Sequence, residues 1–313
     1  MREALVTERR IVPVMNHPTC KSRRPTLLIV GCGDIGRRVL SLVHPRWRVL
    51  ALTSSPDKAA ALRGLGAVPL LGNLDQPATL GRLGALADWV LHLAPPPSQG
   101  SVDSRTRALL ATLARGGRVQ RLVYASTSGV YGDAGGDFFD ETRAARPATD
   151  RARRRVDAEA RVRWFGRSSG VVVTLLRIPG IYAASRAGGH PRDRLQRRAP
   201  VLQAADDVFT NHIHADDLAR ICVAALLRGK PQRVLHASDD TQLRMGDYFD
   251  LAAEVSGLPR PPRISRAQAA EQLSPLQLSF MSESRRLDNN RLKRELRLRL
   301  RYPTVAEGLA SGR

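Results

Sequence analysis

Short apolar runs alternate with amphipathic stretches along the first two thirds of the chain. The runs contain few polar positions, as expected for strands buried on both faces of a parallel sheet, and they lie at 27–30, 47–52, 67–71, 87–93 and 121–125. Helical patterns occupy 35–43, 57–63 and 106–114 between them. Strands that alternate with helices at this spacing predict an α/β fold with a Rossmann-type doubly wound parallel sheet.

The first run leads into a glycine-rich turn. Gly31, Gly33 and Gly36 follow it at the spacing G-x-G-x-x-G, and a helical pattern comes next. In such a turn the first glycine permits the sharp bend, the second lets the backbone approach a pyrophosphate, and the third lets helix and strand pack closely. The free N–H groups at the helix N-terminus then face the anion. The stretch therefore predicts a dinucleotide-binding site.

The end of the second run bears on the choice of dinucleotide. An NAD site has an acidic residue there, about 20 residues after the glycines, which binds the ribose hydroxyls. This chain has Thr53 and Ser54 instead, with Lys58 soon after. Without an acid a 2′-phosphate meets no repulsion, and the hydroxyls with Lys58 or Arg37 could hold it. The sequence favours NADP, and NAD stays open.

Composition limits the class of protein. The chain has 313 residues, of which 42% are hydrophobic, enough for one large α/β domain with a small lobe. We find no apolar run of about 18 residues or more and no secretory h-region, so we expect a soluble cytoplasmic protein without a membrane span. The three cysteines form no C-x-x-C pair, which argues against a disulfide framework or a thiolate metal site.

The formal charge of +21 raises the question of nucleic-acid binding. The arginines are spread along the chain, however, and only 4% of the residues are aromatic, so platforms for base stacking are scarce. We favour a general bias towards arginine over a nucleic-acid partner. Anionic substrates or cofactor phosphates would still be attracted.

Several motifs together resemble those of the extended short-chain dehydrogenase/reductase superfamily, which includes nucleotide-sugar epimerases and dehydratases. Beyond the glycine turn they are HLAPP at 92–96, YASTSGVYGD at 124–133, LLRIPGIY at 175–182, FTNHIHADDLA at 209–219 and LDNNRLKREL at 287–296. Each motif alone is weak, but their shared order over about nine tenths of the chain is specific. With the glycine turn, the resemblance implies a cofactor site made of Gly31, Gly33, Asp34, Ile35, Gly36, Thr53, Ser54, Lys58, Asn73, Leu74, Ala94, Pro95 and Pro179.

The resemblance also implies a division of the chain. Residues 26–182 are expected to form the dinucleotide-binding domain. Residues 183–313 are expected to form a small C-terminal substrate lobe, with 208–228 returning to the main domain. The loop 186–200, rich in glycine, proline and arginine, suits a substrate loop, and 1–25 is read as a flexible basic tail.

Catalysis in this superfamily relies on a Ser/Thr, Tyr and Lys trio, in which the hydroxyl polarises the substrate oxygen and the tyrosinate moves the proton. The family's hydroxyl falls on Thr127. A glutamate follows the family's Tyr-x-x-x-Lys by four residues and matches Glu159, which puts Arg151 where the tyrosine belongs and Arg155 where the lysine belongs. An arginine cannot shuttle protons near neutral pH. Arg155 could keep positive charge near the cofactor ribose, and Arg151 could clamp an anionic substrate.

Other candidate acids, bases and ligands are weighed against structural roles. Tyr131 and Tyr182 are read as core or loop residues. His212 and His214 lie two apart without a nearby third ligand, so we expect packing and no metal site. Asp216 is expected to cap the helix that follows. The cluster Arg192, Arg194, Arg197 and Arg198 is read as a solvated face, with a phosphate clamp as the alternative.

Two functional hypotheses result. The first is an NAD(P)-dependent oxidoreductase or epimerase of atypical short-chain type, acting on an unidentified small molecule, with anionic compounds and sugar nucleotides as candidates. The second is a catalytically inactive NADP(H)-binding sensor or regulatory protein, suggested by Arg151 and Arg155. By resemblance, a homodimer would pair through the helices at 106–114 and 151–163.

Overall fold

A seven-stranded sheet forms the centre of the molecule in a computed structural model that describes residues 25–81 and 83–311. Its strand order is β12-β7-β5-β4-β1-β2-β3, and every neighbouring pair is parallel. The strands are β1 (Thr26–Val30), β2 (Arg48–Thr53), β3 (Val68–Leu71), β4 (Trp89–His92), β5 (Arg121–Thr127), β7 (Val172–Ile178) and β12 (Arg233–His236). This confirms the predicted doubly wound Rossmann-type sheet. The predicted tail lies outside the described residues, apart from Pro25.

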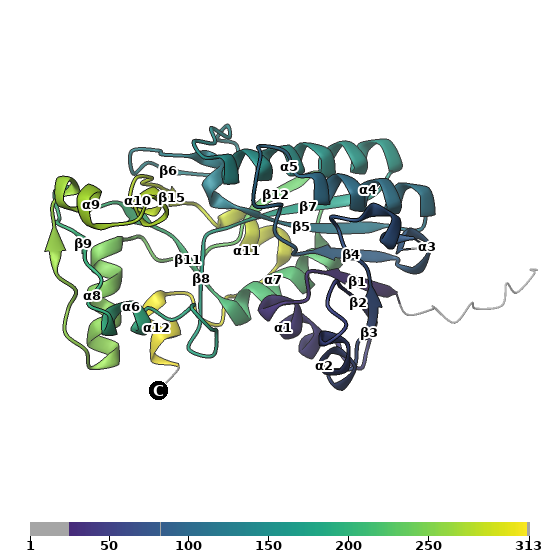
Figure 1. Cartoon of the computed structure of the whole chain (residues 1–313), viewed down its shortest axis with the longest axis horizontal. Helices are drawn as coiled ribbons and strands as arrows, with labels where there is room; N and C mark the ends of the chain where they lie inside the picture. Colours follow the sequence, from purple (N-terminus) through teal and green to yellow (C-terminus); the bar gives the residue numbers. More distant parts are fainter. Residues whose placement is uncertain (1–24, 82, 312–313) are drawn as a thin grey trace, which may run out of the picture.

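Helices cover both faces of the sheet (Figure 1). One face packs against α1 (Asp34–Val43), α2 (Lys58–Gly64), α7 (Ala215–Arg228) and α11 (Asn290–Leu296). The other packs against α3 (Leu83–Leu86), α4 (Ser104–Gly116) and α5 (Asp150–Ser169). The apolar strands are buried because both faces are covered, as the near-absence of polar positions in β1 required.

Short-range chemistry sets the ends of the helices over the second face. The side chain of Asp103 accepts the N–H of Thr106 at the start of α4, and Thr149 caps α5 in the same way. Both helices end at a glycine in the left-handed region, Gly117 at φ +61° and Gly170 at φ +67°. α5 therefore begins at a fixed residue, which matters because it carries Arg151.

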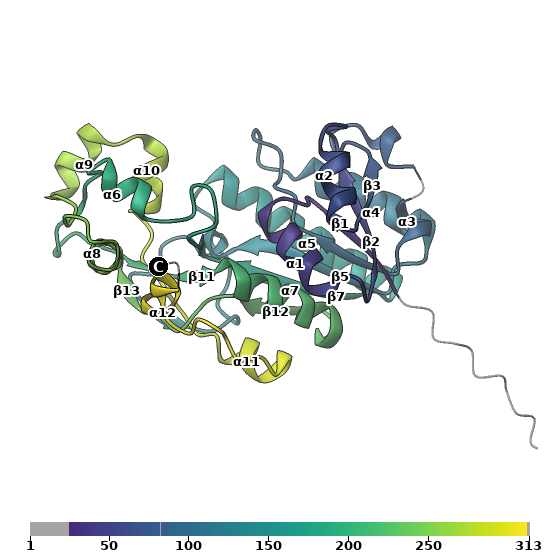
Figure 2. The ribbon, with the colours of Figure 1, turned by 90° about the horizontal axis from the view of Figure 1, so that it is seen from below.

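A separate hydrophobic cluster holds together the part of the chain that Figure 2 shows beside the sheet. Its members include Tyr248, Phe249, Val201 and Val305. The helices there are α6 (Arg192–Gln196), α8 (Met245–Ser256), α9 (Arg266–Gln272), α10 (Pro275–Phe280) and α12 (Val305–Ala310). We call these elements, with the strands β9 (Val201–Leu202) and β14 (Arg263–Ile264), the small lobe. No helix in the described ranges is both long and apolar enough to cross a membrane.

Short pairs of strands, parallel or antiparallel, connect the small lobe with the sheet layer. They join β8 (Gly180–Tyr182) to β11 (His212–His214), β10 (Phe209–Thr210) to β13 (Leu243–Arg244), and β6 (Phe138–Phe139) to β15 (Arg286–Leu287). The described residues also include the 3-10 helices η1 (Pro77–Leu80) and η2 (Ser128–Tyr131).

The segment 208–228, expected to return to the main domain, supplies α7 to one face of the sheet and is followed by a further strand. Phe209 and Thr210 pair with β13 outside the sheet, whereas β12, beyond residue 228, adds an edge strand beside β7. Val234 and Leu235 of β12 are buried, so their apolar side chains account for this extra strand. The sheet layer thus also includes β12, and the bounds of the predicted domains stay a prediction.

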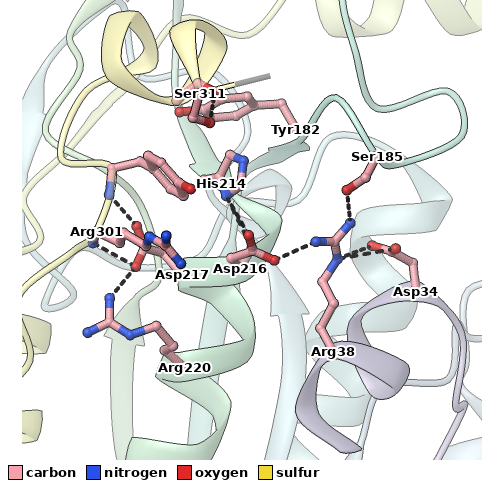
Figure 3. A network of polar contacts seen from close by, with 12 residues as sticks. Asp34, Arg38, Tyr182, Ser185, His214, Asp216, Asp217, Arg220, Arg301 and Ser311 are labelled. Carbon is pink, nitrogen blue, oxygen red and sulfur yellow. Dashed lines mark hydrogen bonds and ion pairs between the residues drawn. The ribbon is translucent and has the colours of Figure 1, made fainter. Parts of the chain in front are cut away.

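The N-terminus of α7 differs from the expectation that Asp216 caps it. His214 is the capping residue, and its Nδ1 accepts the N–H of Asp216 at 3.2 Å. Asp216 instead accepts a hydrogen bond from Arg38 of α1, which also contacts Asp34 and Ser185 (Figure 3). Arg38 binds the Asp216 carboxylate, so this carboxylate does not cap the helix. The His214 imidazole accepts the backbone N–H instead.

The neighbouring carboxylate, Asp217, is fully buried. It accepts the backbone N–H groups of Arg301 and Tyr302 at 2.8 and 2.7 Å and pairs with Arg220 at 2.6 Å (Figure 3). The start of α7 is thereby bound both to α1 and to the segment just before α12.

Candidate functional site

Three adjoining cavities run along the carboxyl ends of the strands, past the switch point between β1 and β4 where the strand order reverses. We call them together the trough. The outer cavity has a volume of about 570 Å³, the central cavity about 320 Å³ and the lobe cavity about 460 Å³. Ligands of open α/β sheets bind at such a switch point. The position and size of the trough therefore suit an extended ligand.

The predicted cofactor residues all line this trough. The central cavity is lined by Gly31, Gly33, Asp34, Ile35, Gly36 and Pro179. The outer cavity is lined by Thr53, Ser54, Lys58, Asn73, Leu74, Ala94 and Pro95, and also by Gly31 and Gly33. Residues from five separate segments are thus gathered into one continuous surface.

The glycines of the turn meet different surroundings. Gly31 has φ +86°, and a Cβ there would lie 2.5 Å from the backbone nitrogen of Ala94. At Gly36 a Cβ would lie 3.3 Å from Ile29 of β1, so helix and strand pack closely. At Gly33 a Cβ would meet no atom within 4 Å, although Gly33 lines both cavities. Bare backbone therefore borders open space at the start of α1, which fits a dinucleotide pyrophosphate.

Asp34, in the first turn of α1, brings a negative charge to this anion site. It is neutralised by two arginines, Arg38 at 3.2 Å and Arg186 at 2.9 Å. Burial opposes ionisation, but the hydrogen bonds from both arginines outweigh it and lower the pKa of Asp34. Arg186 also lines the central cavity, so the loop that carries it adds positive charge there.

The outer cavity is rich in cations. Arg37 and Lys58 line it together with Thr53 and Ser54. A further arginine at its rim, Arg105, is held by Asp75 at 2.6 Å. The side chains that the sequence associated with a 2′-phosphate are therefore brought together.

Thr127 and Arg155 stand where the central and lobe cavities meet, and both line each cavity. The Thr127 hydroxyl oxygen accepts the N–H of Gly129 at 3.2 Å, which leaves its own hydrogen for another acceptor. Arg155 donates to the carbonyl of Ala125 at 2.7 Å and to the Tyr124 hydroxyl at 3.1 Å. Burial raises the pKa of Tyr124 to about 12, so this phenol stays protonated beneath Arg155.

Arg151 lies one turn before Arg155 on α5 and lines the lobe cavity. Its guanidinium packs over Phe280 of α10, 4.7 Å from the ring centroid. Burial is the main cause that lowers the pKa of Arg151, with a further contribution from neighbouring arginines. The three predicted catalytic positions, Thr127, Arg151 and Arg155, are thus brought to one cavity.

Glu159 fixes how α5 faces the trough. It is buried and accepts hydrogen bonds from Ser126 at 2.5 Å and from Arg177 at 2.7 Å. Arg155 and Arg151 lie one and two turns upstream on the same helix face. The glutamate that aligned this helix with the family pattern is therefore also the residue that anchors the helix to the sheet.

The remaining candidates have packing roles. Tyr131 and Tyr182 are 1% and 2% exposed. His212 stacks on Tyr248 with the ring centroids 4.0 Å apart, and burial lowers its pKa to about 3. Within the described residues no group of histidine, cysteine and carboxylate side chains could hold a metal ion.

Three of the four arginines in the predicted surface cluster are solvated. Arg192, Arg197 and Arg198 are exposed, whereas Arg194 lies 4.7 Å over the Phe249 ring. This agrees with the interpretation as a solvated face.

A buried chain of hydrogen bonds lies behind η2. The Tyr131 hydroxyl and His236 Nε2 are 2.6 Å apart, and His236 Nδ1 lies 2.9 Å from the carbonyl of Asp288. A carbonyl only accepts, so Nδ1 carries the proton and Nε2 accepts from Tyr131. Burial is the first cause that lowers the pKa of His236, to about 4. The imidazole is therefore neutral near pH 7.

The residues of the trough that were not predicted include the charged side chains of Arg105, Arg154, Arg186, Glu283 and Arg285. The sequence held a signal for Arg154, because positions 151, 154 and 155 share one helix face. Arg186 lies in the predicted substrate loop, but nothing in its sequence context pointed to Asp34.

The comparison with known proteins agrees with this geometry. A family model described as NAD(P)H-binding matches residues 31–228, which is more than half of the chain. The chain belongs to the NAD(P)H-binding family. The match begins at Gly31, the first glycine of the turn, and ends with α7. It therefore includes Thr127, the lining of the central cavity and, apart from Val30, the lining of the outer cavity.

Solved structures share the fold of this NAD(P)H-binding protein. A functionally unknown conserved protein from Silicibacter pomeroyi is 31% identical, with a TM-score of 0.78 over 92% of this chain and 97% of that one. UDP-glucose 4-epimerase from Thermotoga maritima is 18% identical, with a TM-score of 0.75 over 91% and 96%. dTDP-glucose 4,6-dehydratase from Bacillus anthracis, in complex with NAD, is 13% identical, with a TM-score of 0.74 over 92% and 95%. The family match confirms the NAD(P)H-binding part of the expected resemblance, and the shared fold agrees with the fold expected for extended short-chain dehydrogenases/reductases.

A curated relative matches a shorter part. It is a 4-hydroxy-2-methyl-3-oxo-4-farnesyl-3,4-dihydroquinoline-1-oxide ketoreductase from Stigmatella aurantiaca, 35% identical over 117 residues. The match covers 34% of this chain, and the chain spans only 35% of the length of that relative.

Replacing two glycines of the turn separates folding from binding. We expect Gly31→Ala to lower the melting temperature strongly, because its Cβ would collide with the Ala94 backbone in a left-handed conformation. Gly33→Ala has room, so it should stay folded and lose about tenfold or more in affinity for NADPH. Thermal denaturation and calorimetric titration measure the two effects. Equal NADPH affinity in wild type and Gly33→Ala would contradict the placement of the pyrophosphate.

The buried imidazole of His236 predicts a pH dependence of stability. The unfolded chain protonates this residue near its ordinary pKa of about 6.5, but the folded chain does so only at about 4. Lowering the pH from 7 to 5 should therefore reduce the free energy of unfolding by about 2 kcal/mol through this group. Urea unfolding at both pH values should show that decrement lost in His236→Gln and kept in Tyr131→Phe, where the imidazole stays buried. An unchanged pH dependence in His236→Gln would refute the assignment.

Proposed function

We propose that this chain is an NADP(H)-dependent oxidoreductase of atypical short-chain type, which interconverts a carbonyl and a hydroxyl group on a small molecule in the lobe cavity. The observation that carries the proposal is the place of Thr127, whose hydroxyl stands where the central cavity opens into the lobe cavity. A cofactor running from the outer to the central cavity would end beside it. Epimerisation also belongs to this proposal, because it oxidises a hydroxyl group to a carbonyl and then reduces the carbonyl again.

The choice of NADP rests on the outer cavity. Arg37 and Lys58 line it, and no acidic residue follows β2 at Thr53 and Ser54. A 2′-phosphate carries nearly two negative charges and would find two cations and two hydroxyl groups there. For NAD, the carboxylate that normally binds the ribose hydroxyls is missing.

The residues of the site divide the remaining work. When bound, the nicotinamide supplies or accepts the hydride. Thr127 donates its free hydroxyl hydrogen to the substrate oxygen, and Arg155, held by Ala125, keeps positive charge between the two cavities. Among the described residues that line the lobe cavity, Glu283 is the only carboxyl group and is paired with Arg285 at 2.7 Å. We therefore propose that the proton added to the substrate oxygen comes from solvent water and passes through the Thr127 hydroxyl.

A second candidate function is supported by the same cavity. Arg151 and Arg155 occupy the positions of the family's tyrosine and lysine, and no phenol lines the described part of the lobe cavity. A protein that binds NADP(H) without turnover, as a sensor or regulatory protein, would need only the outer and central cavities.

The expected homodimer, the cytoplasmic location and the absence of a nucleic-acid partner stay predictions. The helices proposed to pair are α4 and α5, and α5 carries Trp164, which is 65% exposed. The division into a cofactor domain and a substrate lobe also stays a proposal, supported by the separate cluster of the small lobe.

Cofactor choice is tested by removing the cations of the outer cavity. Arg37→Gln and Lys58→Gln should each weaken NADPH binding about tenfold, because each removes one charge partner of the 2′-phosphate, and should leave NADH binding nearly unchanged. Arg48→Gln, at the exposed start of β2, is the matched control and should change neither. Calorimetric titration measures the affinities. If wild type prefers NADH, or if both cofactors weaken together, the proposed NADP preference is wrong.

Turnover is tested by following NADPH oxidation with a panel of sugar nucleotides, aldehydes and ketones. Thr127→Val should lower kcat by about 100-fold or more with NADPH affinity unchanged, since it removes one donor to the reacting oxygen, and Thr127→Ser should retain most activity. Arg151→Tyr restores the family's phenol and should raise any reductase activity on neutral substrates. NADPH binding without turnover in wild type, with activity gained only in Arg151→Tyr, would favour the sensor.

A further inference from the structure

The lobe cavity holds more positive charge than the proposed redox step needs. Four arginines line it against a single carboxylate, Glu283, and they are Arg151, Arg154, Arg155 and Arg285. The first three come from one face of α5, and the fourth lies just before β15. The ligand of this cavity should therefore be an anion.

Three of these arginines are already engaged by the protein. Arg155 donates to the carbonyl of Ala125, Arg154 to the carbonyl of Gly100, and Arg285 to Glu283 and to the carbonyl of Gly132. These contacts hold the guanidinium groups in place and use part of their hydrogen-bonding capacity. These three arginines contribute positive electrostatic potential to the cavity, but they have fewer N–H groups free to bind a ligand.

Arg151 differs from the other three. In the part of the chain that the structure describes, its guanidinium makes no hydrogen bond or ion pair. It packs on the ring of Phe280 and lies within electrostatic range of Glu283, which is itself paired with Arg285. Stacking on a ring leaves the N–H groups in the guanidinium plane available. Two parallel N–H groups of this kind match the two oxygens of a carboxylate.

The remaining walls combine apolar and polar side chains. The apolar part includes the prolines 95–97, Phe209, Met245 and Phe280, and the polar part consists of Ser98, Thr127, Ser128, Thr210 and Asn211. A ligand that fills this cavity would pair one anionic end with an apolar body. The diphosphate of a sugar nucleotide carries at least two charged groups and a polar sugar, and it would leave the prolines, Phe209, Met245 and Phe280 unmatched.

We infer that the substrate is a carboxylic acid whose carboxylate is held in bidentate fashion by Arg151, with the reacting carbonyl carbon placed beside Thr127, so that the enzyme acts on an oxo acid and its hydroxy acid. This inference rests on the proposed function. In the reductive direction the hydride of NADPH goes to the carbonyl carbon and a proton from water goes to its oxygen, which yields the hydroxy acid and NADP⁺.

The experiment uses the full chain saturated with NADP⁺ and calorimetric titration of defined probes. Phenylpyruvate and its methyl ester differ in the charge and in one methyl group. Pyruvate and 2-oxoglutarate vary the size and charge, and UDP-glucose represents the sugar nucleotides. We expect at least one oxo acid to bind, with phenylpyruvate about tenfold or more tighter than its ester, because the ester cannot accept the charged fork.

Variants locate the effect on one side chain. Arg151→Gln should erase the preference for the acid over the ester, and Arg151→Lys should restore only part of it, since an ammonium lacks the planar fork. Arg153→Gln is the matched control, because Arg153 lies on the same helix, exposed and paired with Asp150 at 2.7 Å. It should behave as wild type.

The outcomes separate the two levels of the proposal. Failure of all three oxo acids to bind, an acid preference that survives Arg151→Gln, or tighter Arg151-dependent binding of UDP-glucose would each overturn the substrate assignment while NADPH binding stays intact. Loss of NADPH binding by the wild-type chain would instead contradict the proposed function.

Discussion

The ion pair between Glu159 and Arg177 determines how α5 lies against the sheet. Both side chains are only 7% exposed, and Ser126 adds a hydrogen bond at the end of β5. An ion pair buried this deeply gains little over apolar packing, but it accepts only one geometry. Because helix positions four and eight residues upstream share that face, the pair directs Arg155 and Arg151 into the trough. The chemistry of the site thus depends on an ion pair whose two residues line none of the three cavities.

The sheet and the cofactor turn could be predicted because their causes are local. An apolar run such as 27–30 can be satisfied only by burial on both faces, and Gly31 is required by a left-handed backbone against Ala94. The cofactor residues followed from this turn and from motifs at strand ends, which a parallel sheet brings to one edge. The trough therefore contains every predicted cofactor residue.

The parts that escaped prediction depend on contacts between distant segments. Arg186 reaches Asp34 across 152 positions, and Phe280 reaches Arg151 from a six-residue helix whose pattern gives no period. At α7 the cap passed to His214 because Arg38, far away in sequence, claims Asp216. Strands of two residues, such as β9 and β14, have no hydrophobic period to read. Such features follow from the tertiary fold and leave no trace in neighbouring residues.

Asp217 has a consequence for anyone who wishes to isolate the cofactor layer. The glycine turn, the sheet and α7 lie before residue 237, which suggests a compact fragment for crystallisation or engineering. Yet the carboxylate of Asp217 is buried and takes two of its hydrogen bonds from the backbone of Arg301 and Tyr302. A fragment that stops earlier would remove both backbone donors and leave this buried carboxylate with its ion pair to Arg220. The segment that contains Arg301 and Tyr302 therefore helps to stabilise the layer that carries the glycine turn, and a fragment designed to fold alone should include it.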